Sequence, residues 1–439
     1  MSLYQLERER DLSELVETLR RSDDPSIRRR AAEIIGGLFE NEAFEQSDLV
    51  LEREGSGGPA IGVPDAADAE TVIDVLVSVV KADDDEGVRA AAIDALDHHG
   101  QDAIERVVYE LSEKDIESAT DWVAARAFAD VLDDEKPELR MAAATGLGRV
   151  GDPSVTAAVV ARLSDPDARV RARSATACGR IGDPRAVGAL ESRLSDDPDI
   201  DVRVAAADAL GEIRTEAALG VLLASADDAS ESVRRVVAGA LGQFGSVRPI
   251  DALVDYLEDG SETVRRTAMY SMVEILSNAP PQRSHEVREA AADRLGGATA
   301  DEVIPPLSEI LTESSGTPQR RNAAWLLGRV VGPEHGSVAR EALLAALGDD
   351  DGMTAQFAAT SLTRLDGSGL EADLLALVRD GEADREARSK ALFVLGKVGG
   401  DDARAALGEF VDRTDDDGLR EGAFSALSKL GGIGGGGPR

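Results

Sequence analysis

The amino-acid sequence predicts an all-α fold, an α-solenoid in which antiparallel helix pairs stack into a superhelix. Three observations predict it. A segment of about 31 residues recurs along most of the chain, its apolar residues fall on one helical face, and Gly-Asp-Pro turns follow its helices. Such a repeat outweighs local propensity, because each copy is one supersecondary unit that cannot bury its apolar face alone.

The copies align on an apolar residue that precedes an arginine, which we number position 0. Successive anchors are Val170, Val202, Val233 and Val264, separated by 32, 31 and 31 residues. Position 8 is usually apolar, position 9 is often glycine, and alanines crowd positions 4 and 5. At about 100° per residue, positions 0, 4, 5, 8, 11 and 12 share one helical face. The other anchors are Ile27, Val88, Leu139, Val287, Gln319, Ala387 and Leu419, with Thr354 keeping the spacing but lacking the arginine.

The helix before each anchor has an apolar stripe of its own, as at Leu12, Leu15, Val16 and Leu19. Each unit is therefore a pair of antiparallel helices, and stacking the pairs creates one continuous core. The Gly-Asp-Pro turn, as at residues 151–153, ends one helix and begins the next, because proline suits a first helical turn.

In chain order, residues 1–38 form an N-terminal helix pair that turns at an Asp-Asp-Pro sequence, and residues 39–70 then interrupt the repeat. This acidic, Gly- and Pro-containing insert is expected to be flexible, with a partner-binding loop as the alternative. Residues 71–430 form the repeat solenoid. The Gly-rich tail of residues 431–439 is expected to be disordered.

The spacing departs from the period at two places in the solenoid. Val88 and the next anchor are 51 residues apart, which predicts an extra helix around residues 103–111 or 122–132. Val264 and the next anchor are only 23 residues apart, which predicts that one first helix is missing or reduced.

The chain of 439 residues carries a formal net charge of −36, with 84 acidic and 48 basic residues, and only six of the basic residues are lysine. An acidic, lysine-poor surface is typical of a salt-rich cytoplasm, where salt screens self-repulsion, so we expect a halophilic archaeal protein. An ordinary acidic scaffold would share the charge but not the shortage of lysine. With no signal peptide and no apolar span of about 18 residues, the expected location is cytoplasmic.

Two residue types have a structural interpretation. Arginine at position 1 recurs in almost every copy, close to an Asp-containing turn of the neighbouring copy. We expect these arginines to form a ladder of ion pairs along the array. The single cysteine, Cys178, stands at position 8 and is expected to be a buried apolar residue.

The exposed face of the second helices is the candidate binding site. Positions 2, 3, 6 and 10 point away from the core and would line the concave surface of the solenoid. In the four C-terminal copies they hold six basic residues and one acidic residue. Aromatic residues interleaved with Arg and Lys are typical of a binding hot spot. The candidate partner-binding residues are Arg266, Tyr270, Arg321, Trp325, Arg329, Phe357, Arg364, Lys390, Phe393 and Lys397.

Such a groove suits an acidic protein or peptide segment, through charge complementarity and anchor pockets. Two other interpretations stay open: the aromatic residues pack on neighbouring helices, or the face binds nucleic acid. The net charge of −36 disfavours nucleic acid, which needs positive potential across a duplex footprint. Arg29 and Arg30 form a second, weaker basic patch near the other end of the chain. The oligomeric state is left open.

The repeat resembles the HEAT-like repeats named after the phycobilisome (PBS) lyases. The resemblance rests on the sequence Asp-Pro-Asp-x-x-Val-Arg at residues 165–171 and Cys-Gly-Arg-Ile-Gly-Asp at residues 178–183, and it covers roughly residues 10–430. It implies a non-catalytic scaffold that binds other proteins. Some haloarchaeal proteins of this type are taxis adaptors that link receptor signalling to the motility motor. The opening Met-Ser-Leu-Tyr-Gln-Leu is similar to theirs, which implies such a role.

The same resemblance leaves a tetrapyrrole (bilin) lyase as the enzymatic alternative, although nothing in the sequence specifies a tetrapyrrole pocket. HEAT-like deoxyhypusine hydroxylases bind two irons through His-Glu pairs, and only His285 with Glu286 matches that pattern. No Ser-His-Asp arrangement or phosphate-binding glycine loop stands out. We therefore expect no catalytic residues, no metal and no cofactor.

Overall fold

The structure is a computed structural model that describes residues 3–47, 66–112, 121–331, 336–365 and 369–431. These residues form α-helices and short 3-10 turns, with no β-strand among them, so the all-α prediction is confirmed. None of the described helices combines the length and the apolar character that crossing a membrane requires. The chain divides into two compact units, Met1–Val221 and Leu222–Arg439, which we describe separately.

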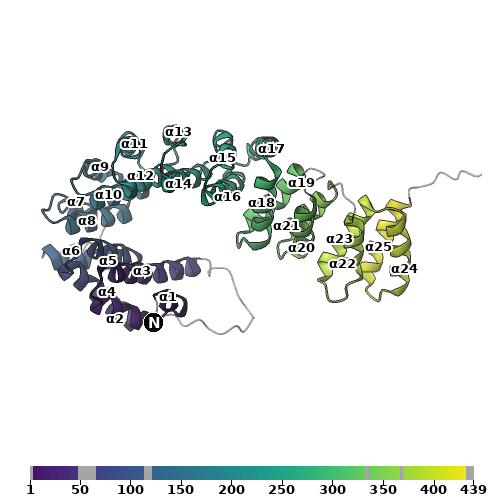
Figure 1. Cartoon of the computed structure of the whole chain (residues 1–439), viewed down its shortest axis with the longest axis horizontal. Coiled ribbons are helices and arrows are strands. Elements are labelled where there is room, and N and C mark those ends of the chain that lie inside the picture. The colour runs from purple at the N-terminus through teal and green to yellow at the C-terminus, as the bar shows by residue number, and fades with distance from the viewer. Residues whose placement is uncertain (1–2, 48–65, 113–120, 332–335, 366–368, 432–439) are drawn as a thin grey trace, which may run out of the picture. The chain divides into compact units, whose positions relative to one another are not determined.

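The first unit contains the helix pairs α2/α3, α4/α5, α9/α10 and α11/α12, while α8 packs against both α6 and α7. Second helices pack side by side, and Figure 1 shows α9 and α11 in a row next to α10 and α12. The helices are α1 (Leu3–Glu9), α2 (Leu12–Arg21), α3 (Pro25–Ser47), α4 (Ala66–Ala82), α5 (Glu86–His98), α6 (Gln101–Ser112), α7 (Asp121–Ala129), α8 (Pro137–Val150), α9 (Thr156–Arg162), α10 (Ala168–Ile181), α11 (Val187–Asp196) and α12 (Ile200–Ile213).

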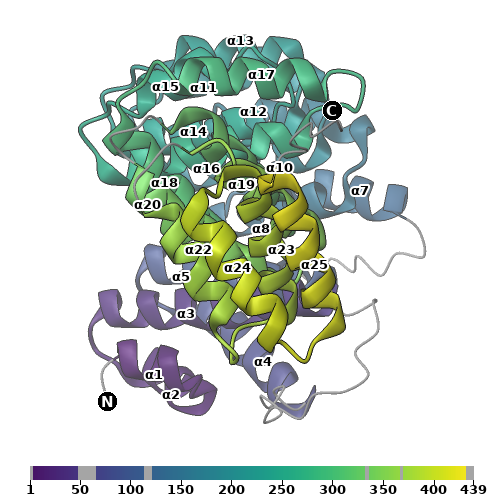
Figure 2. The same cartoon turned by 90° about the vertical axis from the view of Figure 1, so that its right-hand side faces the viewer.

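The second unit contains the pairs α15/α16, α18/α19, α20/α21, α22/α23 and α24/α25, and Figure 2 shows the last two pairs packed together. Helix α13 (Glu216–Ala224) spans the division between the units. The remaining helices are α14 (Glu231–Gly242), α15 (Ile250–Tyr256), α16 (Glu262–Asn278), α17 (Ser284–Leu295), α18 (Ala300–Glu313), α19 (Thr317–Val330), α20 (Gly336–Ala345), α21 (Gly352–Leu362), α22 (Leu370–Arg379), α23 (Arg385–Val398), α24 (Asp401–Arg413) and α25 (Asp417–Leu430).

Glycine at position 9 lets neighbouring second helices approach closely. A Cβ atom on Gly148 would lie 3.0 Å from the Cα atom of Ala177, and one on Gly179 would lie 2.8 Å from the Cα atom of Ala209. Backbone atoms cannot move aside as a flexible side chain can, so only glycine fits here without a shift of the helices. Next to Gly179, Cys178 is completely buried, as predicted.

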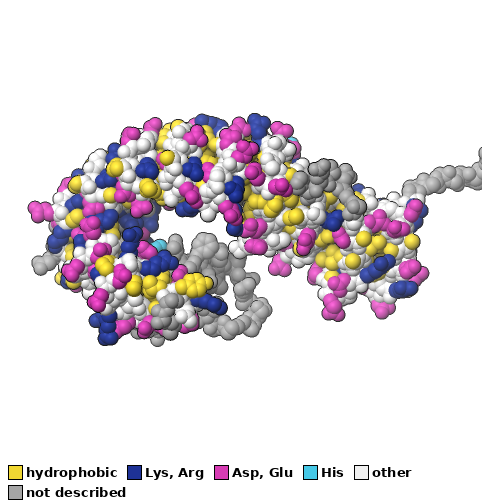
Figure 3. Space-filling view, in the orientation of Figure 1, with side chains coloured by type: hydrophobic (Ala, Val, Ile, Leu, Met, Phe, Trp, Pro, Cys, Tyr) yellow, Lys and Arg dark blue, Asp and Glu magenta, His cyan; other side chains and the backbone are white. Residues whose placement is uncertain are grey.

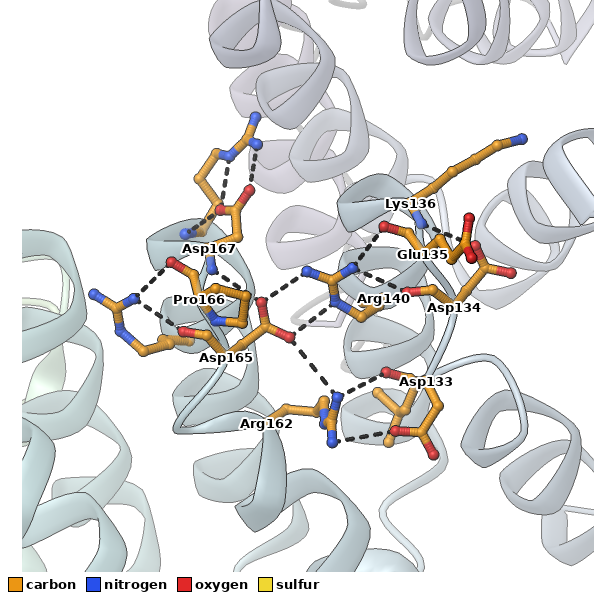
Figure 4. A network of polar contacts seen from close by, with 12 residues as sticks. Asp133, Asp134, Glu135, Lys136, Arg140, Arg162, Asp165, Pro166 and Asp167 are labelled. Carbon is orange, nitrogen blue, oxygen red and sulfur yellow. Dashed lines mark hydrogen bonds and ion pairs between the residues drawn. The ribbon is translucent and has the colours of Figure 1, made fainter.

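Several position-1 arginines form rungs of the predicted ladder, although Arg265 and Arg388 donate to carbonyl oxygens instead. Arg140 donates from Nε and Nη2 to the two carboxylate oxygens of Asp165, each at 2.8 Å, and from Nη1 to the carbonyl oxygens of Asp134 and Glu135 (Figure 4). Asp165 also accepts the backbone N–H of Asp167, so one carboxylate joins a helix to the next turn. The same two-point contact occurs in the pairs Arg28–Asp83, Arg171–Asp197, Arg234–Asp259 and Arg320–Asp349.

The helices around the predicted insert extend further than the sequence suggested. Helix α3 runs on to Ser47 and α4 begins at Ala66, so the predicted boundaries at residues 39 and 70 lie inside helices. The stretch up to Ser47 contains no proline and no glycine after Gly37, so nothing in it ends the helix. Residues 48–65 and 432–439, which hold the rest of the insert and most of the tail, lie outside the described residues.

The two irregular spacings have different outcomes. Between Val88 and Leu139 both candidate segments are helical, as α6 and α7, where one extra helix was predicted. After α16, α17 packs on α15, α16 and α19, while α18 and α19 form a complete pair. No helix lies between α16 and α17, so the predicted absence of a first helix before Val287 is confirmed, and α17 is an additional, unpaired helix. The buried residues Val287 and Leu295 of α17 fit the repeat pattern equally well in a helix that belongs to a pair and in one that does not.

Candidate functional site

The ten predicted partner-binding residues all belong to the second unit, on α16, α19, α21 and α23 or, for Arg364, directly after α21. The structure places them in local groups. Arg266 lies beside Tyr270, and Arg329 lies over Trp325 with the charge of Arg364 close to it. Lys390 contacts the neighbour of Phe357, and Phe393 lies below Lys429.

The most basic group surrounds Trp325, whose side chain is half-buried on α19. The guanidinium carbon of Arg329 lies 3.6 Å from the centroid of the Trp325 ring, and that of Arg288 on α17 lies 5.8 Å away. Both distances permit a cation–π attraction. We call Arg288, Trp325, Arg329 and Arg364 the Trp325 cluster. Arg288 was missed by the sequence prediction, because it stands at position 1 and was assigned to the ladder.

Asn322 holds the Trp325 cluster in place. Its side chain is 2% exposed, and its Oδ1 accepts a hydrogen bond of 3.0 Å from Nη2 of Arg288. Its Nδ2 donates to Ser277 Oγ at 2.9 Å and to the carbonyl oxygen of Val273 at 3.3 Å. One buried amide therefore joins α16, α17 and α19. Position 3 was expected to face solvent, which is wrong for Asn322 because the additional helix α17 covers it.

Positive charge in the Trp325 cluster exceeds the negative charge around it. The ion-pair partner of Arg329 is Glu289, at 3.6 Å, and Arg364 is exposed with no side-chain partner among the described residues. Burial lowers the pKa of Arg329, and the charges of Arg364 and Arg288 lower it further. Burial likewise lowers the pKa of Arg288. Among the described residues, Glu289 is the one carboxylate in ion-pair contact with these three guanidinium groups, through Arg329.

Three other predicted cations already have acceptors within the protein. Arg321 donates to both carboxylate oxygens of Asp351, at 2.6 and 2.5 Å, and this hydrogen bonding holds the pKa of Asp351 well below its usual value. Arg266 forms an ion pair with Glu309. Lys390 donates to Gln356 Oε1 at 3.0 Å and lies 3.6 Å from Glu386. These side chains have less charge left for a partner than the Trp325 cluster.

The predicted aromatic residues differ in exposure. Tyr270 and Phe393 are 37% and 36% exposed, whereas Phe357 is half-buried. Burial raises the pKa of Tyr270, and the negative charge of Glu309 raises it further. The Lys429 Nζ atom lies 5.5 Å from the centroid of the Phe393 ring. Lys397, one turn after Phe393, is exposed and has no side-chain partner among the described residues.

The weaker basic patch of the first unit is largely paired. Arg29 and Arg30 both contact Glu33, with Nε of Arg29 at 3.0 Å. Arg29 lines a cavity of about 320 Å³ over α3, α5, α8 and α10. Two further arginines of this cavity, Arg169 and Arg173, also have carboxylate partners. Its charges are therefore balanced internally.

Two side chains of types that often perform chemistry in proteins, Cys178 and His99, are shielded here. Burial raises the pKa of the Cys178 thiol to about 12, so the nucleophilic thiolate does not form near neutral pH. Burial, with repulsion from His98, lowers the pKa of His99 to about 4. Within the described ranges, no three His, Cys, Asp or Glu side chains are placed to hold a metal ion.

On the face shown in Figure 3, acidic side chains are spread over both units with basic ones among them.

Comparison with known proteins gives matches to sequences and to solved structures. A family model described as HEAT repeats matches residues 125–199, 187–274 and 340–428. A HEAT repeat-containing taxis protein from Halobacterium salinarum is 42% identical over 463 aligned residues, covering 98% of this chain and 99% of the relative. Importin beta is 14% identical with a TM-score of 0.38, covering 96% of this chain and 61% of importin beta. A chain of the phycocyanin lyase complex from Nostoc sp. PCC7120 is 19% identical with a TM-score of 0.33, and the match covers 70% of this chain and 94% of the lyase chain.

Proposed function

This chain belongs to the family of HEAT repeat proteins, and from that premise we propose that it is a non-catalytic scaffold of taxis signalling. In this proposal the second helices of the second unit bind an acidic segment of a partner protein. HEAT-type arrays present extended surfaces of stacked helices, which suits them to binding other proteins.

The observation that carries the binding site is the Trp325 cluster. In a chain with 84 acidic and 48 basic residues, three guanidinium groups gather around one tryptophan with Glu289 as the nearby carboxylate. Tryptophan and arginine are the residues most enriched in interface hot spots. An acidic segment of a partner would supply the negative charge that this surface lacks.

The taxis role rests on the relative from Halobacterium salinarum, which is 42% identical and matches nearly the full length of both chains. We propose that this chain, too, acts in taxis, as an adaptor between receptor signalling and the motility motor. The acidic, lysine-poor composition fits a protein that works in a salt-rich cytoplasm.

Capture of the partner in high salt tests the binding site. Trp325→Ala and Arg329→Glu are each expected to reduce the retained partner by about tenfold, as truncation of hot-spot residues does. Arg413→Glu is the matched control, because Arg413 is 79% exposed on α24 and away from the Trp325 cluster. Undiminished retention by both variants would contradict the proposed face. Cells that carry only the Trp325→Ala protein should also lose taxis on semi-solid agar while still swimming.

A further inference from the structure

We infer that Arg288, Arg329 and Arg364 form, around Trp325, a binding site for two neighbouring carboxylate side chains of the partner's acidic segment. This inference rests on the proposed function and specifies the chemistry of its central contact. It adds Arg288, from the additional helix α17, to the residues that bind the partner.

The first argument is that Arg288 lacks the aspartate which the repeat supplies elsewhere. Position-1 arginines such as Arg140 and Arg171 each hold an aspartate through two hydrogen bonds. Arg288 occupies the same position of the motif but meets the amide oxygen of Asn322 instead. Its Nε atom is buried without a hydrogen-bond partner among the described residues. The half-buried Arg288 thus keeps its positive charge without a carboxylate, and a carboxylate from outside could pair with the exposed part of the guanidinium.

The second argument is the orientation of Arg329. Its guanidinium lies 3.6 Å from the centre of the Trp325 ring, which fixes the position of the group and leaves N–H donors at its edge. An arginine that is already held in place loses less conformational entropy when it binds a carboxylate. Its intramolecular partner Glu289 is half exposed and 3.6 Å away, so the contact between them is loose.

The third argument is the balance and extent of the charge. Counting the described residues alone, the cluster holds three guanidinium groups and one carboxylate in ion-pair contact, which leaves two positive charges. On either side of it, Arg321 and Lys390 are already engaged with Asp351, Glu386 and Gln356. Among the described site residues, the cations without a carboxylate partner therefore gather at the Trp325 cluster, and Lys397 is a separate single charge on α23. Two adjacent acidic side chains match the Trp325 cluster, whereas a nucleic-acid backbone would need a continuous basic row.

Trp325 itself can report binding. The chain has two tryptophans, so Trp122→Phe leaves Trp325 as the single tryptophan of the full-length protein. In molar potassium chloride, a synthetic oligoglutamate peptide is expected to give a saturable fluorescence change, and an oligoglutamine peptide of equal length none. Contact ion pairs persist in such salt, although charges more than about 3 Å apart are screened. Arg288→Gln and Arg364→Gln should each weaken peptide binding about tenfold, as loss of a charge-assisted hydrogen bond does.

Matched variants decide the outcome. Arg413→Gln makes the same change of net charge at an exposed position on α24 and should leave peptide affinity unchanged. An equally large loss of peptide affinity in Arg413→Gln, or no fluorescence change with any peptide, would overturn the inference. Arg364 is exposed, so Arg364→Gln remains a valid test if replacement of Arg288 unfolds the protein. Tighter binding of inorganic phosphate or of a phosphoserine peptide would assign the site to phosphate and also overturn it.

The same variants separate this inference from the proposed function. If partner capture is lost in Phe393→Ala but kept in Arg288→Gln, the second-helix face binds the partner and the carboxylate site is refuted. If the oligoglutamate peptide binds as expected while Trp325→Ala leaves partner capture unchanged, the carboxylate site stands and the proposed face is refuted.

Discussion

Arg140 and Asp165 form a two-point ion pair that is almost completely shielded from water, with side-chain exposures of 8% and 1%. The carbonyl oxygen of Asp165 accepts a further hydrogen bond from Arg171, which in turn binds Asp197. Each rung is therefore linked to the next through a single residue. Figure 4 shows the first of these rungs, with Arg162 approaching the same carboxylate.

Breaking this rung should destabilise the first unit. Asp165→Ala leaves the guanidinium of Arg140 buried without its carboxylate, and we expect the free energy of unfolding to fall by about 3–5 kcal/mol. The measurement is the denaturant midpoint of the full chain. Glu17→Ala removes the ion-pair partner of Arg21 at an exposed surface. That change should lower the free energy of unfolding by less than about 1 kcal/mol. Equal effects of the two changes would contradict a structural role for the ladder.

The close approach of α10 and α12 makes Gly179 sensitive to substitution. Gly179→Ala places a Cβ atom 2.8 Å from the Cα atom of Ala209, and we expect a loss of about 1–3 kcal/mol from overpacking. Gly408 lies inside α24 with no atom within 4 Å of such a Cβ. Gly408→Ala should therefore stabilise the protein by about 0.5–1 kcal/mol, through helix propensity alone. Thermal unfolding of both variants compares the two expectations.

Burial of His99 should make stability depend on pH. Its pKa is about 4 in the folded protein, below the usual 6.5, so the unfolded chain takes up a proton first as the pH falls. The contribution of His99 to stability is complete above about pH 6.5 and decreases towards pH 4, by at most about 3.5 kcal/mol at 1.4 kcal/mol per pKa unit. His99→Gln should remove this part of the pH dependence. His285→Gln, at a side chain that is 89% exposed, should keep it. An unchanged slope in His99→Gln would refute the expectation.

We expect predicted site residues that already form internal ion pairs to contribute less to partner binding than those that do not. Arg321 is occupied by Asp351, so Arg321→Gln is expected to change partner affinity less than about twofold. Arg364 has no such partner among the described residues, and Arg364→Gln should cost about tenfold. Affinities measured side by side by calorimetry test the order. If Arg321→Gln costs more than Arg364→Gln, internal pairing does not govern binding on this face.

The fold could be predicted from the sequence because its determinants are local. Proline and aspartate mark the turns, as at Asp24 and Pro25 before α3, and the spacing of apolar residues fixes which helix face is buried. The ladder was predictable for the same reason, since the pairing of Arg140 with Asp165, 25 residues later, recurs at separations of 26 and 25 residues in Arg171–Asp197 and Arg234–Asp259. Repeated motifs make contacts between copies predictable even though those residues are distant in sequence.

The composition of the Trp325 cluster could be predicted only in part. The sequence identified Trp325, Arg329 and Arg364, but it placed Asn322 in solvent and Arg288 in the ladder. Both errors come from α17, because an amphipathic helix with a Val-Arg start fits the repeat whether it is a member of a pair or an addition. No local signal distinguishes these cases. Which carboxylate neutralises which arginine likewise depends on contacts between helices, such as Arg321 with Asp351.

Because the rungs Arg140–Asp165 and Arg171–Asp197 use the same donor and the same acceptor, this part of the array is built from interchangeable parts. Removal of residues 165–196 would bring Asp197, Pro198 and Asp199 into the places of Asp165, Pro166 and Asp167, with Arg140 now facing Asp197. The junction would be chemically identical to the original. Gene duplication or deletion in whole units can therefore lengthen or shorten such a protein without any compensating mutation at the seam.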